Sequence, residues 1–245
     1  MTDLGIPCAP ERLAVFLDFD GTLADIVDHP DDVHLPPKTA ESLARLESRT
    51  SGAVAIVTGR PIAQIDALVA PLILPVAGVH GMSRRSFDGT LHNTKHDATL
   101  FAEAQARLTR LHLDLSDTMI EVKPASVAFH YRRRPDLAGS IAEKIHDVLG
   151  DLEGLDILHG KMVVEVKAGH AHKGDAIRAF MAEKPFAGRV PLFAGDDVTD
   201  EFGFAAMREF DGIAIKIGPG ETAAGWRADD PDQFRIWLDR LAVFA

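Results

Sequence analysis

The amino-acid sequence predicts a doubly wound α/β core that is interrupted by a smaller α+β domain. Apolar runs alternate with amphipathic segments near both ends of the chain, which is typical of parallel strands joined by crossover helices. The run at 53–57 is apolar throughout, as expected of a strand covered on both faces. The middle of the chain instead alternates polar and apolar residues, which indicates a sheet with one solvated face. We therefore expect a core formed by residues 1–82 and 169–245, with residues 83–168 inserted as a second domain.

The elements of the core are expected in a regular order. Before the insertion, the sequence predicts a strand at 13–17, a helix at 39–49, a strand at 53–57 and a helix that begins at Pro61. After it, a helix begins at Lys173, a strand spans 190–194, and helices occupy about 200–210 and 231–241. Repetition of strand and helix implies parallel pairing, so both ends of the chain are expected in one Rossmann-like sheet.

The inserted domain is expected to pack two helices on one face of a sheet. The helices are predicted near 98–113 and 135–149, and the strands at 120–123, 126–132 and 161–167. Period-two alternation places one set of side chains on the polar face: Glu121, Lys123, His130, Arg132, Lys161 and Glu165. The opposite face is expected to pack on the helices through Val122, Val127, Phe129, Tyr131, Met162, Val164 and Val166. Hinges between the domains are expected near 81–86 and 168–172.

Composition limits the classes of function. A formal net charge of −11 and a pI near 5.4 argue against a general binder of nucleic acid or of anionic membranes. The single cysteine, Cys8, excludes an internal disulfide, and the N-terminus lacks the layout of a signal peptide. No apolar run approaches the ~20 residues that span a bilayer. We expect a cytoplasmic globular enzyme whose partner is a small molecule.

Two carboxylates stand at the end of the first predicted strand. Asp18 and Asp20 follow an apolar run and precede Gly21 and Thr22. Residues two apart in a strand share a face, so the two carboxylates repel each other unless a counter-ion lies nearby. An oxygen-rich pair suits Mg²⁺ and a phosphate, with one Asp acting as nucleophile and the other as acid and base. A lone Asp-Gly pair would more simply mark a turn.

Other polar residues follow the predicted strands at the same edge of the sheet. Thr58 comes after the strand at 53–57, and Asp196 follows the strand at 190–194. Ligands of open parallel sheets bind at the carboxyl ends of the strands, so these side chains are expected to converge on Asp18. Lys173 opens a helix, where its ammonium and the helix-terminal N–H groups suit a phosphate.

The order of these motifs carries a resemblance to a known superfamily. Asp-Phe-Asp-Gly-Thr-Leu, Thr-Gly-Arg, Lys-Gly and Gly-Asp-Asp-Val-Thr-Asp follow one another between Asp18 and Asp200. In this combination the chain resembles the haloacid dehalogenase superfamily of phosphotransferases. The resemblance implies a Rossmann-like core with an inserted cap domain, and a Mg²⁺-dependent enzyme that forms an aspartyl-phosphate.

The resemblance also implies roles for individual residues. Asp18 would attack phosphorus, and Asp20 would protonate the departing oxygen and later accept a proton from water. Magnesium would be held by Asp18, the main-chain carbonyl of Asp20 and Asp196. Thr58 and Lys173 would hold the phosphoryl oxygens. A carboxylate at Asp20 favours hydrolysis or mutase chemistry over a long-lived phospho-enzyme.

Asp197 and Asp200 are expected close to these residues. In the superfamily, carboxylates at such positions orient metal-bound water or the lysine, here Lys173. The alternative is that both are surface acids that cap the next helix.

The cap sequence narrows the resemblance to trehalose-6-phosphate phosphatases. Its carriers are Gly-Val-His-Gly at 78–81, Glu-x-Lys at 121–123, His-Tyr-Arg at 130–132 and Gly-Lys-x-x-x-Glu at 160–165. In that family the cap grips a disaccharide, and the matching positions here are Glu121, Lys123, Arg132, Lys161 and Glu165. Carboxylates accept hydrogen bonds from sugar hydroxyls, while Lys and Arg donate to them. Arg60 and His80 are expected to line the junction between core and cap.

Several alternatives stay open. The polar face of the cap is also compatible with an ordinary solvated surface. Another sugar phosphate, such as sucrose phosphate, a glycosyl-glycerol phosphate or a hexose phosphate, would use the same core. A phosphomutase and a non-enzymatic regulatory relative fit the residues less well, because the catalytic set is complete and the cap carries inward carboxylates. His170 and His172 fit a solvent-facing hinge better than a transition-metal site. The synthase that makes the substrate would be a separate protein.

Overall fold

The structure is a computed structural model of the 245-residue chain, and it describes residues 5, 8–27, 29–95, 97–160 and 162–244. It separates into two compact units, residues 1–92 with 172–245, and residues 93–171. The first boundary between the units, after His92, lies about ten residues beyond the boundary that the sequence predicted at Ser83. The reason is that β4 (Ser83–Arg85) pairs antiparallel with β3 (Val76–Gly78) and so extends the sheet of the first unit.

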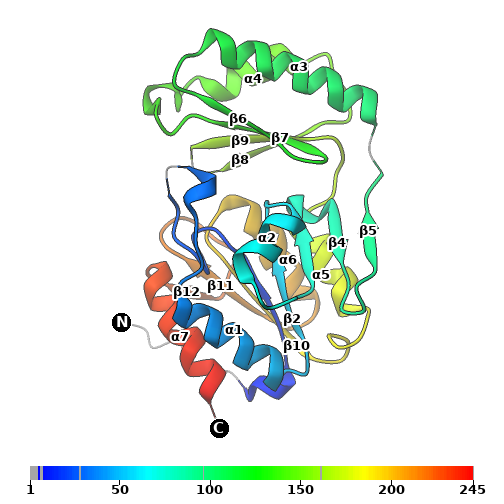
Figure 1. Ribbon diagram of the computed structural model, residues 1–245, viewed down its shortest axis with the longest axis vertical. Coiled ribbons are helices and arrows are strands. Elements are labelled where there is room, and N and C mark those ends of the chain that lie inside the picture. Colours follow the sequence, from blue (N-terminus) through cyan, green and yellow to red (C-terminus); the bar gives the residue numbers. More distant parts are fainter. Residues whose placement is uncertain (1–4, 6–7, 28, 96, 161, 245) are drawn as a thin grey trace. The chain divides into compact units, whose positions relative to one another are not determined.

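An eight-stranded sheet forms the middle of the first unit (Figure 1). Its order is β12-β11-β10-β1-β2-β3-β4-β5, and the strands from β12 to β3 pair in parallel. The bounds not yet given are β1 Leu13–Leu17, β2 Val54–Val57, β5 Leu91–Asn93, β10 Val190–Gly195, β11 Ile213–Ile217 and β12 Trp226–Ala228. The register places Leu17 at the end of β1 between Ala194 and Ile56, so the ends of β10, β1 and β2 lie together. The predicted parallel α/β core is confirmed.

Helices cover both faces of this sheet (Figure 1). Leu13, Val15 and Leu17 pack on one side with α1 (Pro37–Arg49), α2 (Ile62–Val69) and α7 (Pro231–Val243). Ala14 and Phe16 pack on the other side with α5 (Lys173–Met181) and α6 (Glu201–Glu209). Every residue of β1 is therefore buried, which explains why the strand is apolar throughout. Among the described residues, no helix has the length and apolar character needed to cross a membrane.

The second unit contains a four-stranded antiparallel sheet of order β6-β7-β9-β8. Its elements are α3 Ala98–Asp114, β6 Met119–Val122, β7 Ser126–His130, α4 Ile141–Leu149, β8 Asp156–Gly160 and β9 Val163–Lys167. Leu108 of α3 and Ile145 of α4 pack on Phe129 and Val164, so both helices cover one face of this sheet. The antiparallel α+β architecture predicted for the insertion is confirmed.

Two of the side chains expected beneath this sheet are exposed instead. Val122 ends β6 and is 50% exposed, and Met162 is 37% exposed. Met162 lies in the turn between β8 and β9 with a φ of +58°, where the strand alternation no longer holds. The prediction of their burial was therefore wrong, whereas Val127 and Phe129 are fully buried as expected.

Candidate active site

Three aspartates of the first unit form a buried cluster. Asp18 follows β1, Asp196 follows β10, and Asp200 closes the short 3-10 helix η5 (Val198–Asp200). One carboxylate oxygen of each lies within 4.8 Å of the others, and none of the three residues is more than 4% exposed. The expected convergence of Asp18 and Asp196 at the strand ends is thus seen in the structure.

Two glycines make room for this cluster. A Cβ on Gly21 would lie 2.3 Å from the Oδ2 atom of Asp196, and Gly21 has a φ of +78°. A Cβ on Gly195 would lie 2.3 Å from the Cγ atom of Asp200. Both distances are far below a van der Waals contact, so a larger residue at either position would displace a carboxylate. The glycines of the two aspartate motifs are therefore part of the geometry of the site.

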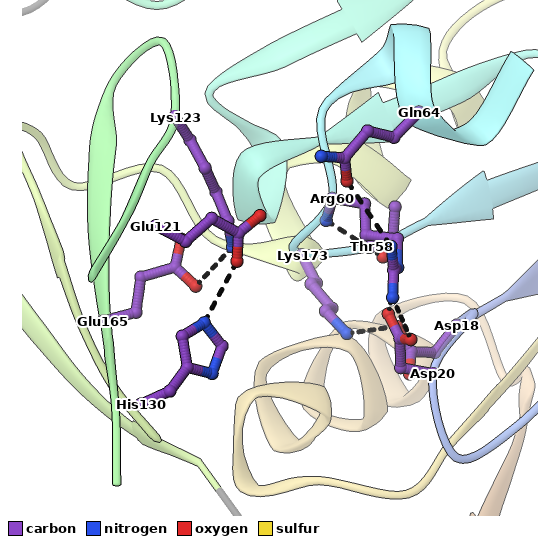
Figure 2. Close-up of polar contacts among 10 residues, drawn as sticks. All are labelled: Asp18, Asp20, Thr58, Arg60, Gln64, Glu121, Lys123, His130, Glu165 and Lys173. Carbon is purple, nitrogen blue, oxygen red and sulfur yellow. Dashed lines mark hydrogen bonds and ion pairs between the residues drawn. The ribbon is translucent and has the colours of Figure 1, made fainter. Parts of the chain in front are cut away.

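Lys173 is the cation of the cluster. Its Nζ atom donates to Asp18 Oδ1 at 2.7 Å and to Asp200 Oδ1 at 2.6 Å, and the Asp18 contact is drawn in Figure 2. Burial opposes the charged ammonium, but the carboxylates of Asp18 and Asp200 outweigh it and raise the pKa of Lys173 above its usual range. Burial raises the pKa of Asp18 well above its ordinary value; Lys173 opposes this, and Asp200 and Asp196 add to it. Lys173 therefore contacts two of the three clustered carboxylates, those of Asp18 and Asp200.

The donor set of the cluster fits a hard divalent cation. Oxygen ligands are what Mg²⁺ prefers, and the three clustered carboxylates offer them within 4.8 Å of one another. Asp18 and Asp196 are suited to hold it. Asp200 has its two oxygens engaged otherwise, because Oδ1 accepts from Lys173 and Oδ2 accepts from the main-chain N–H of Asp197 at 2.9 Å. Asp197 in turn accepts from the N–H of Val198 at 2.8 Å and so caps η5. This geometry suits Asp200 for orienting Lys173.

Asp20 is held by a bidentate arginine. Arg60 donates from Nε to Asp20 Oδ2 at 2.7 Å and from Nη2 to Asp20 Oδ1 at 2.8 Å (Figure 2). The main-chain N–H of Arg60 also donates to the hydroxyl of Thr58 at 3.2 Å, and Thr58 is 1% exposed. The sequence predicted that Arg60 would contact substrate, but it did not predict the pair with Asp20, because the two residues lie forty positions apart. The substrate contact of Arg60 stays a prediction.

His80 is also buried close to the Thr58–Arg60 segment. It is 8% exposed, and a Cβ on Gly59 would lie 2.6 Å from its Nε2 atom. Its main-chain N–H donates to the carbonyl of Thr58 at 2.9 Å. The predicted contact of His80 with substrate stays a prediction.

The polar face of the second unit carries polar side chains in pairs (Figure 2). Lys123 donates to Glu165 Oε2 at 3.1 Å, and the Nε2 atom of His130 lies 3.1 Å from Glu121 Oε2. The register places Ala128 of β7 directly between Glu121 and Glu165 of the neighbouring strands, so the two carboxylates lie in one row. Burial alone would raise the pKa of Glu121, but the His130 hydrogen bond and the Lys123 charge lower it below its ordinary value. Arg132 follows β7 and is half-buried, and Lys161 lies outside the described residues.

Two polar residues of these sites were missed from the sequence. Ser126, which is fully buried, donates from Oγ to Glu165 Oε1 at 2.5 Å. Its position in the alternation with His130 was the signal that could have found it. Lys216 is 5% exposed in β11, and its Nζ atom donates to the main-chain carbonyl of Asp196 and, at 3.3 Å, to that of Ile217. A lysine inside the apolar run Ile-Ala-Ile-Lys-Ile was the signal there.

Comparisons with known proteins show the family of the chain. The family model described as trehalose-phosphatase matches residues 16–232. Trehalose-6-phosphate phosphatase of Escherichia coli strain K12 is 38% identical over 95% of this chain and 87% of its own length. A probable trehalose-phosphate phosphatase of Sinorhizobium fredii is 42% identical over 87% of this chain and 81% of its own length.

Solved structures share the fold. The C-terminal domain of the trehalose-6-phosphate phosphatase of C. albicans superposes with a TM-score of 0.86 at 22% identity, covering 96% of this chain and 93% of that one. A haloacid dehalogenase-like hydrolase from B. subtilis superposes with a TM-score of 0.65 at 12% identity, covering 96% of this chain and 100% of that one. With the fold of the haloacid dehalogenase superfamily and the matches in sequence, the chain belongs to the trehalose-phosphatase family.

Proposed function

We propose that the protein hydrolyses trehalose 6-phosphate to trehalose and phosphate, with Mg²⁺ as cofactor and through an aspartyl-phosphate on Asp18. The observation that carries the proposal is the contact of Lys173 with Asp18 inside a buried cluster of three aspartates. This arrangement combines a nucleophile, a fixed positive charge and oxygen ligands at one strand end. The names of the curated relatives support the choice of substrate.

Asp18 is the nucleophile in this proposal. A carboxylate oxygen of Asp18 attacks phosphorus, the bond from phosphorus to the sugar oxygen breaks, and the phosphoryl group is left on Asp18. Water then attacks phosphorus and releases the Asp18 carboxylate with inorganic phosphate. Lys173 and Thr58 hold the phosphoryl oxygens, and Lys173 is already anchored by Asp200 at 2.6 Å.

Asp20 moves the protons in both steps. It gives a proton to the departing sugar oxygen in the first step and takes one from the attacking water in the second. The bidentate contact with Arg60 holds the carboxylate in place. The first step therefore requires Arg60 to release the oxygen of Asp20 that carries the proton, and in the second step the Asp20 carboxylate acts as the base.

The proposed cofactor is Mg²⁺, which Asp18, Asp196 and the main-chain carbonyl of Asp20 would hold. When bound, it supplies positive charge beside the phosphoryl oxygens. Lys216 keeps the Asp196 segment in place by donating to its carbonyl.

Recognition of the sugar is proposed for the polar face of the second unit. Glu121, Lys123 and Glu165 present donors and acceptors in pairs that sugar hydroxyls can replace. Arg132 and Lys161 are proposed to join them on the strength of the family resemblance. Mixed charge suits a neutral polyol better than a second phosphate, which favours a phosphatase over a mutase.

The proposed setting is the cytoplasm, where a separate synthase would supply the substrate. A single cysteine in 245 residues fits a reducing compartment. The acidic composition fits a small-molecule enzyme with a local basic site.

The test is phosphate release from a panel of substrates, with and without Mg²⁺. The panel holds trehalose 6-phosphate, sucrose 6-phosphate, glucose 6-phosphate and an aryl phosphate, and Asp18→Asn is the blank. We expect Mg²⁺-dependent release with a strong preference for trehalose 6-phosphate. Preference for another sugar phosphate would overturn the substrate, and no release from any compound would overturn the phosphatase.

A further inference from the structure

A strained turn follows β3, directly beside the predicted phosphate-binding segment. Val79 and His80 have φ values of +49° and +54°, and Gly81 after them has +100°. The left-handed region is unfavourable for residues with a Cβ and especially for a β-branched one such as Val79. Two such residues in succession persist only where the surrounding structure holds them, and strain of this kind collects at functional sites.

The turn is held by the backbone of the segment that follows β2. The N–H of Val79 donates to the carbonyl of Arg60 at 3.1 Å, and the N–H of His80 donates to the carbonyl of Thr58 at 2.9 Å. A Cβ on Gly78 would lie 2.7 Å from the carbonyl oxygen of Arg60, so the two chains approach closely here as well. The left-handed conformation thus points two successive N–H groups at this segment.

The imidazole of His80 completes the contact. The space where a Cβ of Gly59 would stand is 2.6 Å from Nε2 and 2.8 Å from Cε1 of His80. Gly59 lies between Thr58, which is 1% exposed, and Arg60, which is 9% exposed. The ring therefore packs on the backbone of Gly59 inside a buried region, where neither side has room to shift.

We propose that the turn Val79–His80 clamps the segment Thr58–Arg60, and that His80 is a positioning residue rather than a ligand of the sugar. By fixing Gly59, the ring sets the hydroxyl of Thr58 and the guanidinium of Arg60, which in turn holds Asp20. The clamp acts on phosphoryl transfer and so rests on the proposed phosphatase function. It predicts that changes at His80 alter turnover of every phosphate ester alike.

The experiment is a double-mutant cycle of Gly59→Ala and His80→Ala. Gly59→Ala puts a methyl group into the space occupied by the His80 imidazole. It is expected to lower kcat/KM about 100-fold, the cost of a displacement of roughly 1 Å at a reacting group. His80→Ala alone is expected to lower it about tenfold, because the segment loses its support. The double variant should recover to about the level of His80→Ala, since the clash is gone, instead of showing the product of both losses.

Controls separate positioning from stability and from the proposed function. Gly225→Ala, where a Cβ would meet nothing within 4 Å, should leave the kinetics and the melting temperature unchanged. Each variant is assayed on trehalose 6-phosphate and on an aryl phosphate, with thermal unfolding and binding of inorganic phosphate by calorimetry in parallel. We expect equal losses on both esters, and weaker phosphate binding in Gly59→Ala that His80→Ala restores.

Three results would overturn the clamp. They are unchanged kinetics and unchanged phosphate binding in Gly59→Ala, losses that multiply in the double variant, and losses confined to trehalose 6-phosphate. If Gly59→Ala does not fold, recovery of folding in the double variant supports the clamp. If the double variant does not fold either, the result contradicts the clamp. If the wild-type protein releases no phosphate, the proposed function fails, while the phosphate-binding arm of the cycle still decides on the clamp.

Discussion

Both units bury acidic side chains, but the first unit gathers them in a cluster and the second unit sets them in pairs. In the first unit one carboxylate oxygen of each of Asp18, Asp196 and Asp200 lies within 4.8 Å of the others, and Lys173 contacts two of the three residues, Asp18 and Asp200. On the polar face of the second unit the carboxylates stand in separate pairs, Glu165 with Lys123 and Glu121 with His130. A cluster of carboxylates offers the oxygen ligands that a hard cation needs, while separate pairs can exchange their hydrogen bonds with neutral hydroxyls. In the proposed function, the first unit therefore carries out the chemistry and the second unit selects the sugar.

The two sites are also built from different backbone elements. The aspartates stand on turns after parallel strands, where Gly21 and Gly195 let the chains approach. The polar pairs stand within antiparallel strands, where the register aligns Glu121, Ala128 and Glu165. Site geometry therefore depends on turns in one unit and on register in the other.

The largest effect is expected at the nucleophile. Asp18→Asn keeps the shape of the side chain but removes the nucleophilic carboxylate, so turnover should fall by about 10⁴-fold or more on every ester. Phosphate release measures turnover, and circular dichroism checks the fold. Retained turnover in a correctly folded variant would contradict the role of Asp18.

Removal of the cation from the cluster should reduce both activity and stability. Lys173→Met leaves two buried carboxylates, those of Asp18 and Asp200, without the ammonium they contact, which is expected to cost about 3–5 kcal/mol of unfolding free energy and roughly 10²- to 10³-fold in kcat. Denaturant unfolding and phosphate release measure the two losses. Lys144→Met, at an exposed lysine of α4, is the control and should change neither. Because an added cation replaces missing positive charge, Mg²⁺ should stabilise Lys173→Met more than wild type; the reverse order would contradict binding of the cation by this cluster.

A variant of the second unit should instead alter substrate affinity. Glu165→Ala removes the acceptor that Lys123 and Ser126 orient, so KM for trehalose 6-phosphate should rise about tenfold with kcat little changed. Ser126→Ala should show a smaller rise in KM, because it only orients Glu165. Steady-state kinetics measure both effects. A fall in kcat without a change in KM would place Glu165 in the chemistry and break the comparison.

The smallest effect is expected in the acid stability of the second unit. Folding lowers the pKa of Glu121, so its ionised form adds stability above its unfolded value of about 4.3, and this gain is lost as pH falls through the lower folded value. The unfolding free energies of wild type and Glu121→Gln are therefore compared at each pH. The excess of wild type over the variant should be larger at pH 7 than at acid pH, by at most about 1 kcal/mol. Glu143→Gln, on the exposed side of α4, is the control. A difference that grows toward low pH would have the wrong sign.

The sequence predicted what periodicity and strand ends determine. Burial on both faces makes β1 and β2 apolar, and the helices at 39–49 and 231–241 agree with α1 and α7 within two residues. Parallel strands bring Asp18 and Asp196 to one edge, so their meeting followed from topology. β3 and β12, with three residues each, are too short for a periodic signal.

Contacts between distant segments had no such signal. The pair of Arg60 with Asp20 and the contact of His80 with Gly59 depend on how two turns pack, which periodicity does not describe. Val122 and Met162 were misplaced because the alternation ends where strands turn. Ser126 and Lys216 could have been predicted from the sequence. Ser126 continues the polar alternation of its strand, and Lys216 interrupts an apolar run.

The most direct test of whether chemistry and sugar recognition belong to separate units is a ratio of specificity constants in two matched variants. The ratio of kcat/KM for trehalose 6-phosphate to that for an aryl phosphate is measured in wild type, Thr58→Ala and Glu165→Ala. We predict that Thr58→Ala lowers both constants equally and leaves the ratio unchanged, whereas Glu165→Ala lowers the ratio about tenfold. A ratio that falls in Thr58→Ala and holds in Glu165→Ala would contradict the assignment of chemistry and sugar recognition to separate units.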